Sequence, residues 1–154
     1  MPVAAVGIGS NVGDAAAHVR RAFARLAELG TVVARSRLYA SAPWGVADQE
    51  PFVNAAALVE TALDPRSLLA ALQRIEAEEG RTPTYRWGPR VLDLDILAYD
   101  DLRLGEADLT IPHARLHERA FALVPLAEID PRYAELRDAL PPGERASVVE
   151  LGPR

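Results

Sequence analysis

Two residue types are missing from this chain of 154 residues, which contains neither cysteine nor lysine. Without cysteine there can be no disulfide, no thiolate zinc site and no cysteine nucleophile. All 17 basic residues are arginine, so a P-loop lysine, a Schiff-base lysine and a Ser–Lys dyad are excluded as well. Any phosphate chemistry must therefore rely on guanidinium groups, backbone N–H groups and metal ions.

Long apolar segments and excess positive charge are also missing. No apolar run approaches the roughly 20 residues that cross a bilayer, and residues 1–10 do not resemble a signal peptide. We therefore expect no membrane contact and a cytoplasmic location. A formal net charge of −5 argues against broad nucleic-acid binding, which requires basic surface. The length and the 49% hydrophobic content are typical of one globular domain, residues 1–154.

The pattern of apolar and turn residues predicts alternating strands and helices. We expect strands at 3–8, 31–39, 52–63 and 91–99. Helices should start after Asp14 and after Asp64-Pro65, because Asp is a favoured N-cap and Pro a favoured first helical residue. Gly30 and Gly80 should stop them. After residue 100 we expect short pieces: a turn, an extended segment at 109–111, a helix from Ala114 and a Pro-broken tail.

The order strand, helix, strand, strand, helix, strand is typical of the ferredoxin-like (βαββαβ) α+β fold. An antiparallel sheet backed by helices on one face is the expected result. This fold hosts many activities, so the function must be argued from particular residues.

Two acids in the fourth predicted strand are the strongest functional signal. Side chains alternate along a strand, so Asp93 and Asp95 share one face while Leu94 points into the core. Neighbouring carboxylates repel each other, and Mg²⁺ offsets that repulsion because it prefers carboxylate, phosphate and water oxygens. The pair alone is equally consistent with a solvent-facing stripe whose acids bind arginines.

Arginine is concentrated just before these acids. Arg81, Arg86 and Arg90 precede the pair, together with Trp87 and Gly88. Arginine binds phosphate with two parallel hydrogen bonds and stays charged at any working pH. Acids for metal beside arginines for phosphate suit phosphoryl transfer. The alternative is a loop whose arginines pair with nearby acids, although the tryptophan and glycine favour a loop that covers a substrate.

The segment from Ser41 to Asn54 offers groups that suit an organic ring. Trp44 and Phe52 have flat apolar faces, and the Asn54 amide can both donate and accept hydrogen bonds. A planar heterocycle needs that combination, although a small aromatic core beneath a loop would use the same residues.

Two further motifs carry weaker signals. His113, followed by Arg119 and Phe121, could contact a polyphosphate, although a single histidine is more often structural. The glycine-rich stretch 7–13 lacks the spacing of the dinucleotide fingerprint. We interpret that stretch as a tight turn from strand to helix.

Five stretches together resemble one known family. GIGSNVGD, SAPWG with FVNAA, QRIEAEEGR, RWGPRVLDLDIL and LTIPHARLHERAF resemble, in the same order, motifs of 6-hydroxymethyl-7,8-dihydropterin pyrophosphokinase. The resemblance extends to about residue 131, and its most specific part is RWGPRxLDLDI. It implies a ferredoxin-like fold and transfer of diphosphate from ATP to the hydroxymethyl group of 6-hydroxymethyl-7,8-dihydropterin. The products would be the pterin diphosphate and AMP, in folate biosynthesis.

The resemblance also implies roles for individual residues. Asp93 and Asp95 match ligands of two Mg²⁺ ions, and Arg81, Arg90 and Asp95 match positions associated with catalysis. The positions around ATP are Gln73, Glu76, Arg81, Trp87, Arg90, Ile96, Thr110, His113 and Arg119. The positions of the pterin pocket are Ser41, Pro43, Trp44, Gly45, Phe52, Asn54, Trp87 and Phe121, with Phe52 and Phe121 on either side of the ring. Asp108 departs from the pattern, because some members carry an arginine there near the nucleotide.

These residues lead to the hypothesis that the pterin hydroxyl attacks the β-phosphorus of ATP and expels AMP. Two alternatives remain: a two-metal phosphohydrolase that uses water as nucleophile, and a non-catalytic ferredoxin-like module that binds a small ligand. A heterocycle pocket argues against the first, and the clustering of arginine and aspartate argues against the second. The expected partners are pterin and ATP, with no nucleic acid and no membrane, and a monomer is the working hypothesis.

Overall fold

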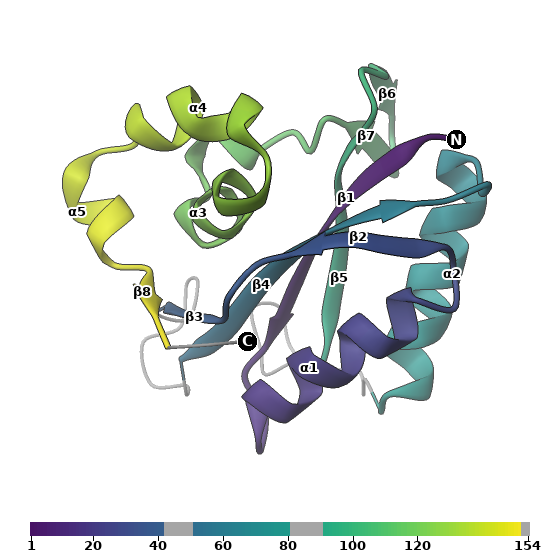
Figure 1. Cartoon of the computed structure of the whole chain (residues 1–154), viewed down its shortest axis with the longest axis horizontal. Coiled ribbons are helices and arrows are strands. Elements are labelled where there is room, and N and C mark those ends of the chain that lie inside the picture. The colour runs from purple at the N-terminus through teal and green to yellow at the C-terminus, as the bar shows by residue number, and fades with distance from the viewer. Residues whose placement is uncertain (42–50, 81–90, 152–154) are drawn as a thin grey trace.

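A computed structural model describes residues 1–41, 51–80 and 91–151. Its centre is a six-stranded sheet in the order β5-β1-β4-β3-β8, with β2 also paired to β4 (Figure 1). All neighbouring strands are antiparallel. The strands of this sheet are β1 (Val3–Ser10), β2 (Thr31–Arg35), β3 (Tyr39–Ser41), β4 (Phe52–Glu60), β5 (Asp93–Tyr99) and β8 (Val149–Glu150). The hairpin of β6 (Leu104–Glu106) and β7 (Leu109–Ile111) forms a second, two-stranded sheet.

Both predicted helix starts are confirmed. The Asp14 carboxylate accepts a hydrogen bond from the Ala17 N–H at 3.1 Å, at the start of α1 (Ala15–Leu26). The Asp64 carboxylate accepts one from the Ser67 N–H at 2.8 Å, at the start of α2 (Pro65–Glu78). In each case the side chain satisfies a backbone donor that has no partner within the helix, so the sequence determines where the helix begins.

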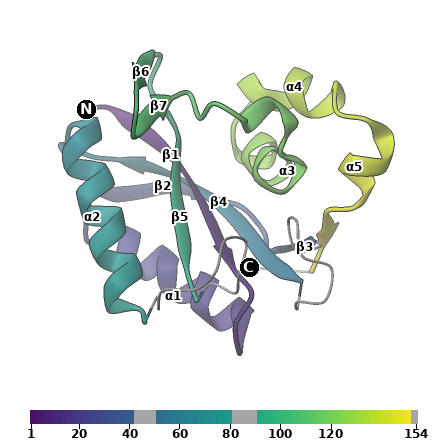
Figure 2. The ribbon, with the colours of Figure 1, turned by 180° about the vertical axis from the view of Figure 1, so that it is seen from behind.

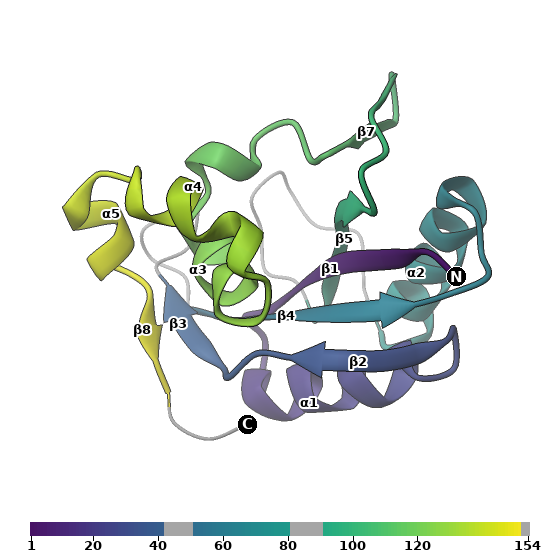
Figure 3. The same cartoon turned by 45° about the horizontal axis from the view of Figure 1, so that its top comes forward.

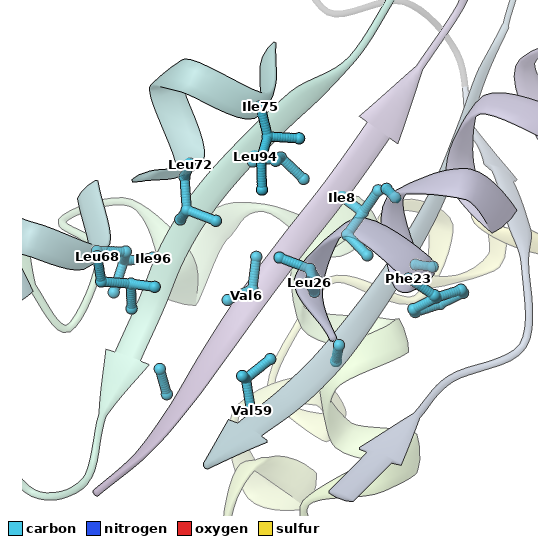
Figure 4. Packing of buried hydrophobic residues seen from close by; sticks show 14 of the residues in the cluster. Val6, Ile8, Phe23, Leu26, Val59, Leu68, Leu72, Ile75, Leu94 and Ile96 are labelled. Carbon is cyan, nitrogen blue, oxygen red and sulfur yellow. The ribbon is translucent and has the colours of Figure 1, made fainter. Parts of the chain in front are cut away.

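Helices α1 and α2 cover the same face of the sheet. Their apolar side chains interdigitate with those of the central strands. Figure 4 labels part of this core: Val6, Ile8, Phe23, Leu26, Val59, Leu68, Leu72, Ile75, Leu94 and Ile96. Full burial of one such side chain contributes about 1.5–3 kcal/mol. The same view places Leu94 and Ile96 of β5 against α2, as the alternation in this strand predicts.

The expectation that helices cover only one face is wrong. Helix α3 (Ala120–Ile129) packs on the opposite face, followed by α4 (Ala134–Asp138) and α5 (Pro142–Ala146), and Figure 3 shows α1 and α3 on opposite sides of the sheet. The predicted helix from Ala114 is a short 3₁₀ turn, Leu116–Glu118, before α3 begins. Helix α3 is apolar on most sides and contains Pro125, so it lacks the one-sided pattern from which an amphipathic helix is predicted.

The predicted strand at 31–39 is also different in detail, because it is interrupted between β2 and β3. The glycine-rich stretch is only partly a turn: Gly7 and Gly9 lie inside β1, whereas Gly13 has a positive φ of 60° before α1. Within the described part of the chain, no helix is both long and apolar enough to cross a membrane. Figure 2 shows α2 beside β5, with the β6–β7 hairpin beyond the end of that strand.

Candidate active site

The two acids predicted to bind metal lie on β5, the edge strand of the main sheet. Leu92 and Leu94 are buried, with exposed fractions of 1% and 4%, whereas Asp93 is half-buried and Asp95 is exposed. Alternation along the strand therefore places both carboxylates on the face opposite α2. Helix α3 packs on this same face. Asp95 and Ala56 both pair with Gly7 and so point to the same side of the sheet, and Ala56 belongs to the core under α3.

A buried acid accepts a hydrogen bond from the backbone between these carboxylates. Glu76 of α2 is 5% exposed, and its Oε2 accepts a hydrogen bond from the Leu94 N–H at 2.7 Å. The sequence predicted Glu76 as a residue near ATP. No local pattern in the sequence could indicate its contact with β5, because the two residues meet only in the folded sheet.

A glycine of β1 forms the floor of this face between β5 and β4. Gly9 of β1 pairs with Asp93 on one side and with Asn54 on the other. Directly paired residues point to the same side of a sheet, so this row presents an acid, a bare backbone and an amide in that order. A Cβ on Gly9 would lie 3.3 Å from the Asn54 Oδ1. The glycine therefore leaves room for the Asn54 side chain to lie close to the backbone of β1.

Three of the predicted pterin residues, Ser41, Phe52 and Asn54, lie together beside this floor. Asn54 is 3% exposed, and its Nδ2 donates to the Ser41 Oγ at 2.7 Å. Phe52 lies on the same face of β4, two residues before Asn54, and its ring edge would be 3.6 Å from a Cβ on Gly9. Because Nδ2 is engaged by Ser41, the Oδ1 of Asn54 is the amide atom that faces Gly9.

Two further predicted residues come from the start of α3. The Arg119 guanidinium carbon lies 5.6 Å from the centre of the Phe121 ring, a cation–π contact. The Nε of Arg119 is buried and has no acceptor within the described part of the chain. A buried donor without an acceptor is costly, and an incoming anionic oxygen would remove that cost.

A cleft of about 260 Å³ lies at the outer edge of β5. It brings together four residues predicted at the metal or ATP site: Asp95, Ile96, Thr110 and His113. The other lining residues are Leu69, Leu94, Ala107, Asp108, Leu109 and Ala114. The cleft thus has apolar walls from α2, β5 and β7, with a few polar groups at one side, as small-molecule sites commonly have.

His113 is held in a defined state in this cleft. Burial lowers its pKa below the usual value, against the attraction of Asp95, and the nearby Arg119 and Arg115 lower it further. Its Nδ1 accepts a hydrogen bond from the Arg115 N–H at 3.2 Å. The ring is therefore neutral at neutral pH, and this bond assigns its proton to Nε2.

Asp108 at the rim of the cleft has a partner that the sequence did not indicate. It pairs with Arg66 of α2 at 2.7 Å, and Arg66 also contacts Glu106. The departure from the family pattern at Asp108 thus coincides with an ion pair that connects α2 to the β6–β7 hairpin.

Several predicted site residues cannot be placed in this way. Pro43, Trp44, Gly45, Arg81, Trp87 and Arg90 lie outside the described residues. Gln73 is exposed on α2, one turn before the end of the helix. The assignments of these residues therefore remain predictions.

Comparisons with known proteins point in one direction. Residues 5–131 match the family model described as 7,8-dihydro-6-hydroxymethylpterin-pyrophosphokinase (HPPK). The chain is 48% identical over 133 residues to a 2-amino-4-hydroxy-6-hydroxymethyldihydropteridine pyrophosphokinase of Methylorubrum extorquens, covering 85% of this chain and 84% of the relative. It is 43% identical over 129 residues to the protein of that name from Bacillus subtilis, covering 82% of this chain and 77% of the relative.

Plant and structural relatives extend this comparison. A mitochondrial folate synthesis bifunctional protein of Pisum sativum is 42% identical over 125 residues, covering 80% of this chain and 24% of the relative. The crystal structure of Plasmodium falciparum HPPK-DHPS with pteroate has a TM-score of 0.72 at 16% identity. That match covers 89% of this chain but only 42% of the Plasmodium chain, and at such identity it supports the fold alone.

Proposed function

The chain belongs to the 7,8-dihydro-6-hydroxymethylpterin-pyrophosphokinase family, and we propose that its reaction takes place on the sheet face that carries Asp93, Gly9 and Asn54. It is an ATP-dependent pyrophosphokinase that transfers the pyrophosphoryl group of ATP to hydroxymethyldihydropterin in folate biosynthesis. The row of an acid, a bare glycine and a buried amide supports this location. It offers groups suited to a phosphate chain and to a heterocycle on either side of the glycine.

ATP is proposed to occupy the cleft at the edge of β5. Ile96 and its apolar neighbours suit the adenine base, and Thr110 with the neutral His113 can donate hydrogen bonds. Arg119, whose buried Nε has no acceptor among the described residues, is proposed to bind a phosphate oxygen. The remaining ATP residues are proposed from the resemblance: Gln73 and Glu76, with Arg81, Trp87 and Arg90 outside the described residues.

The pterin is proposed to lie over the glycine floor. Phe52 and Phe121 would stack on either side of its ring, and the Asn54 Oδ1 would accept hydrogen bonds from ring N–H groups. Ser41 fixes the orientation of the Asn54 amide through its 2.7 Å hydrogen bond. Pro43, Trp44, Gly45 and Trp87, outside the described residues, complete the proposed pocket.

Two Mg²⁺ ions are proposed to bind at Asp93 and Asp95. The donor set fits, because two carboxylates on one strand face leave coordination positions for phosphate and water oxygens, which Mg²⁺ prefers. Among residues 1–41, 51–80 and 91–151, no group of three or more His, Asp or Glu side chains could enclose a metal ion. We propose that phosphate oxygens of the nucleotide and water supply further ligands. When bound, Mg²⁺ neutralises charge on the phosphates.

The proposed chemistry is in-line displacement at the β-phosphorus. The pterin hydroxyl oxygen forms a bond to the β-phosphorus and loses its proton to solvent. The bond between the β-phosphorus and the α–β bridging oxygen breaks, and AMP leaves with that oxygen. Asp93 and Asp95 hold the metal, Arg119 and His113 donate to phosphate oxygens, and Phe52 with Asn54 holds the ring. Positioning and fixed charges supply most of the acceleration in such reactions.

An AMP assay tests this proposal. Protein, ATP and MgCl₂ are incubated with or without 6-hydroxymethyl-7,8-dihydropterin, and nucleotides and pterins are separated by chromatography. We expect AMP and the pterin diphosphate in equal amounts, and only when the pterin is present. AMP or phosphate release without the pterin would indicate a phosphohydrolase. Absence of magnesium-dependent ATP binding would indicate a non-catalytic module.

The fold plan, the domain organisation, the oligomeric state and the cellular location are proposals as well. The order β5-β1-β4-β2/β3, with α1 and α2 connecting the strands on one face, supports a ferredoxin-like plan for residues 1–99. We propose one domain, a monomer and a cytoplasmic location.

A further inference from the structure

The strand that leads into the pterin side of the site contains an extra residue. Arg35 of β2 pairs with Ala57 of β4, and Tyr39 of β3 pairs with Asn54 of the same strand. Four steps along the outer strand thus match three steps along β4. The surplus residue makes a β-bulge between β2 and β3, and bulges of this kind re-aim the side chains that follow them.

The bulge changes which face of the sheet the following side chains point to. Residues four apart in a regular strand point to the same side. Here the Arg35 guanidinium lies 5.4 Å from the ring centre of Phe23 on α1, whereas the Tyr39 hydroxyl bonds to Glu128 on α3. The two side chains are therefore on opposite faces of the sheet. Ser41, two residues after Tyr39, shares the face of Tyr39 and so reaches Asn54.

Glu128 is the side chain that bonds to the bulge from α3. Its Oε1 accepts the Arg37 N–H at 3.0 Å and the Tyr39 hydroxyl at 2.6 Å. Arg37 lies between β2 and β3, while the preceding Ser36 bonds to the backbone of Ala56 through both its N–H and its Oγ. Burial and the hydrogen bond to Glu128 raise the pKa of Tyr39 well above its ordinary value, so the phenol remains a donor at physiological pH.

We propose that Glu128 is a positioning residue for the pterin pocket, because its bonds to Arg37 and Tyr39 hold the bulge in the register that places Ser41 against Asn54. A one-residue slip of β3 would move Ser41 to the α1 face and leave the buried Asn54 amide without its partner. This inference rests on the proposed function for its kinetic consequence. The register of β3 is a structural property that can be measured independently.

Two tyrosines allow a matched experiment. Tyr39 and Tyr99 are each 8% exposed, and each hydroxyl donates one hydrogen bond of 2.6 Å, to Glu128 and to the Leu63 carbonyl respectively. Tyr39→Phe and Tyr99→Phe thus remove the same group at equal burial. Only Tyr39 belongs to the strand that carries Ser41. Glu128→Ala removes both bonds to the bulge, and Glu128→Gln retains an acceptor oxygen.

The kinetic readout is KM for the pterin and for ATP, with melting temperature in parallel. For Tyr39→Phe we expect KM for the pterin to rise about threefold to tenfold, the range for one lost hydrogen bond, with KM for ATP unchanged within about twofold. Glu128→Ala should have a larger effect, and Glu128→Gln should restore most of it. Tyr99→Phe, which removes a bond to a neutral carbonyl, should lower the melting temperature without a change in either KM.

Amide hydrogen exchange tests the role of Glu128 separately from the proposed enzymatic function. Glu128→Ala should accelerate exchange at Ala40 and Ser41, while amides in the Gly7–Gly9 part of β1 remain protected. Equal pterin KM values for Tyr39→Phe and Tyr99→Phe, together with unchanged exchange in β3, would overturn the role of Glu128. If the wild-type protein forms no AMP with the pterin, the proposed function fails, but accelerated exchange in β3 would still support the bulge contact.

Discussion

Replacement of Glu76 by alanine tests whether this acid braces β5 or only contacts ATP. The Glu76 carboxylate is 5% exposed and accepts the Leu94 N–H at 2.7 Å, between the two acids proposed to bind Mg²⁺. Glu76→Ala leaves that buried N–H without this acceptor. Loss of a hydrogen bond to a charged group costs about 1.5–3 kcal/mol. For a protein of this size, such a loss lowers the melting temperature by about 3–12 °C.

Glu78 on the same helix provides the control. Its side chain is 50% exposed and pairs with Arg25 at the surface, so Glu78→Ala should change the free energy of unfolding by at most about 1 kcal/mol. Circular dichroism melts of both variants and of Glu76→Gln, whose amide oxygen can still accept, measure the difference. Because β5 carries Asp93 and Asp95, Glu76→Ala should also lower kcat.

One outcome would refute the claim that Glu76 stabilises β5. If Glu76→Ala melts at the wild-type temperature and only KM for ATP rises, Glu76 acts through the nucleotide alone. The claim would be supported if Glu76→Ala strongly lowers the melting temperature and Glu76→Gln largely restores it. The kcat values should then rise in the order Glu76→Ala, Glu76→Gln, wild type.

Three other changes have defined expected results. Asp95→Ala should reduce pyrophosphoryl transfer by at least about 1000-fold, because charge stabilisation is lost. The melting temperature should stay near that of wild type, since the side chain is exposed. Near-normal AMP formation would contradict the metal assignment. Gly9→Ala should raise KM for the pterin more than KM for ATP, because the new Cβ would lie 3.3 Å from the buried Asn54 Oδ1; an unchanged pterin KM would argue against the glycine floor. Hydrogen bonds from Arg21 and Arg25 outweigh burial and lower the pKa of Glu79, so this contribution to stability is present above the unfolded-state pKa of about 4.5 and is lost as pH falls below it. Melting temperature measured between pH 7 and pH 3 should therefore fall less steeply for Glu79→Gln than for wild type, and parallel curves would count against this ion pair.

Local signals in the sequence were sufficient for several features. Asp14 and Asp64 cap their helices as predicted, because a capping bond joins residues only three apart. The alternation in β5 placed the acids on one face and Leu94 in the core, since a strand has a period of two. The motifs that resemble the pterin pyrophosphokinases identified the family from short stretches of chain.

Helix α3 shows where such signals fail. It is apolar on most sides because it packs between the sheet and the C-terminal helices, so it has no one-sided pattern to detect. Its position on the second face of the sheet, and with it the position of Phe121 and Arg119, follows from packing between distant segments.

The pterin side of the site depends on contacts of the same long-range kind. A bulge of one residue between β2 and β3 decides that Ser41 faces Asn54, and the Glu128 carboxylate that bonds to it is 91 residues from Arg37 along the chain. The sequence by itself determined which residues are suited to phosphate, metal and ring. Only the tertiary structure decided which residues of different strands share a face, because strand register is set by pairing and packing between segments far apart in sequence.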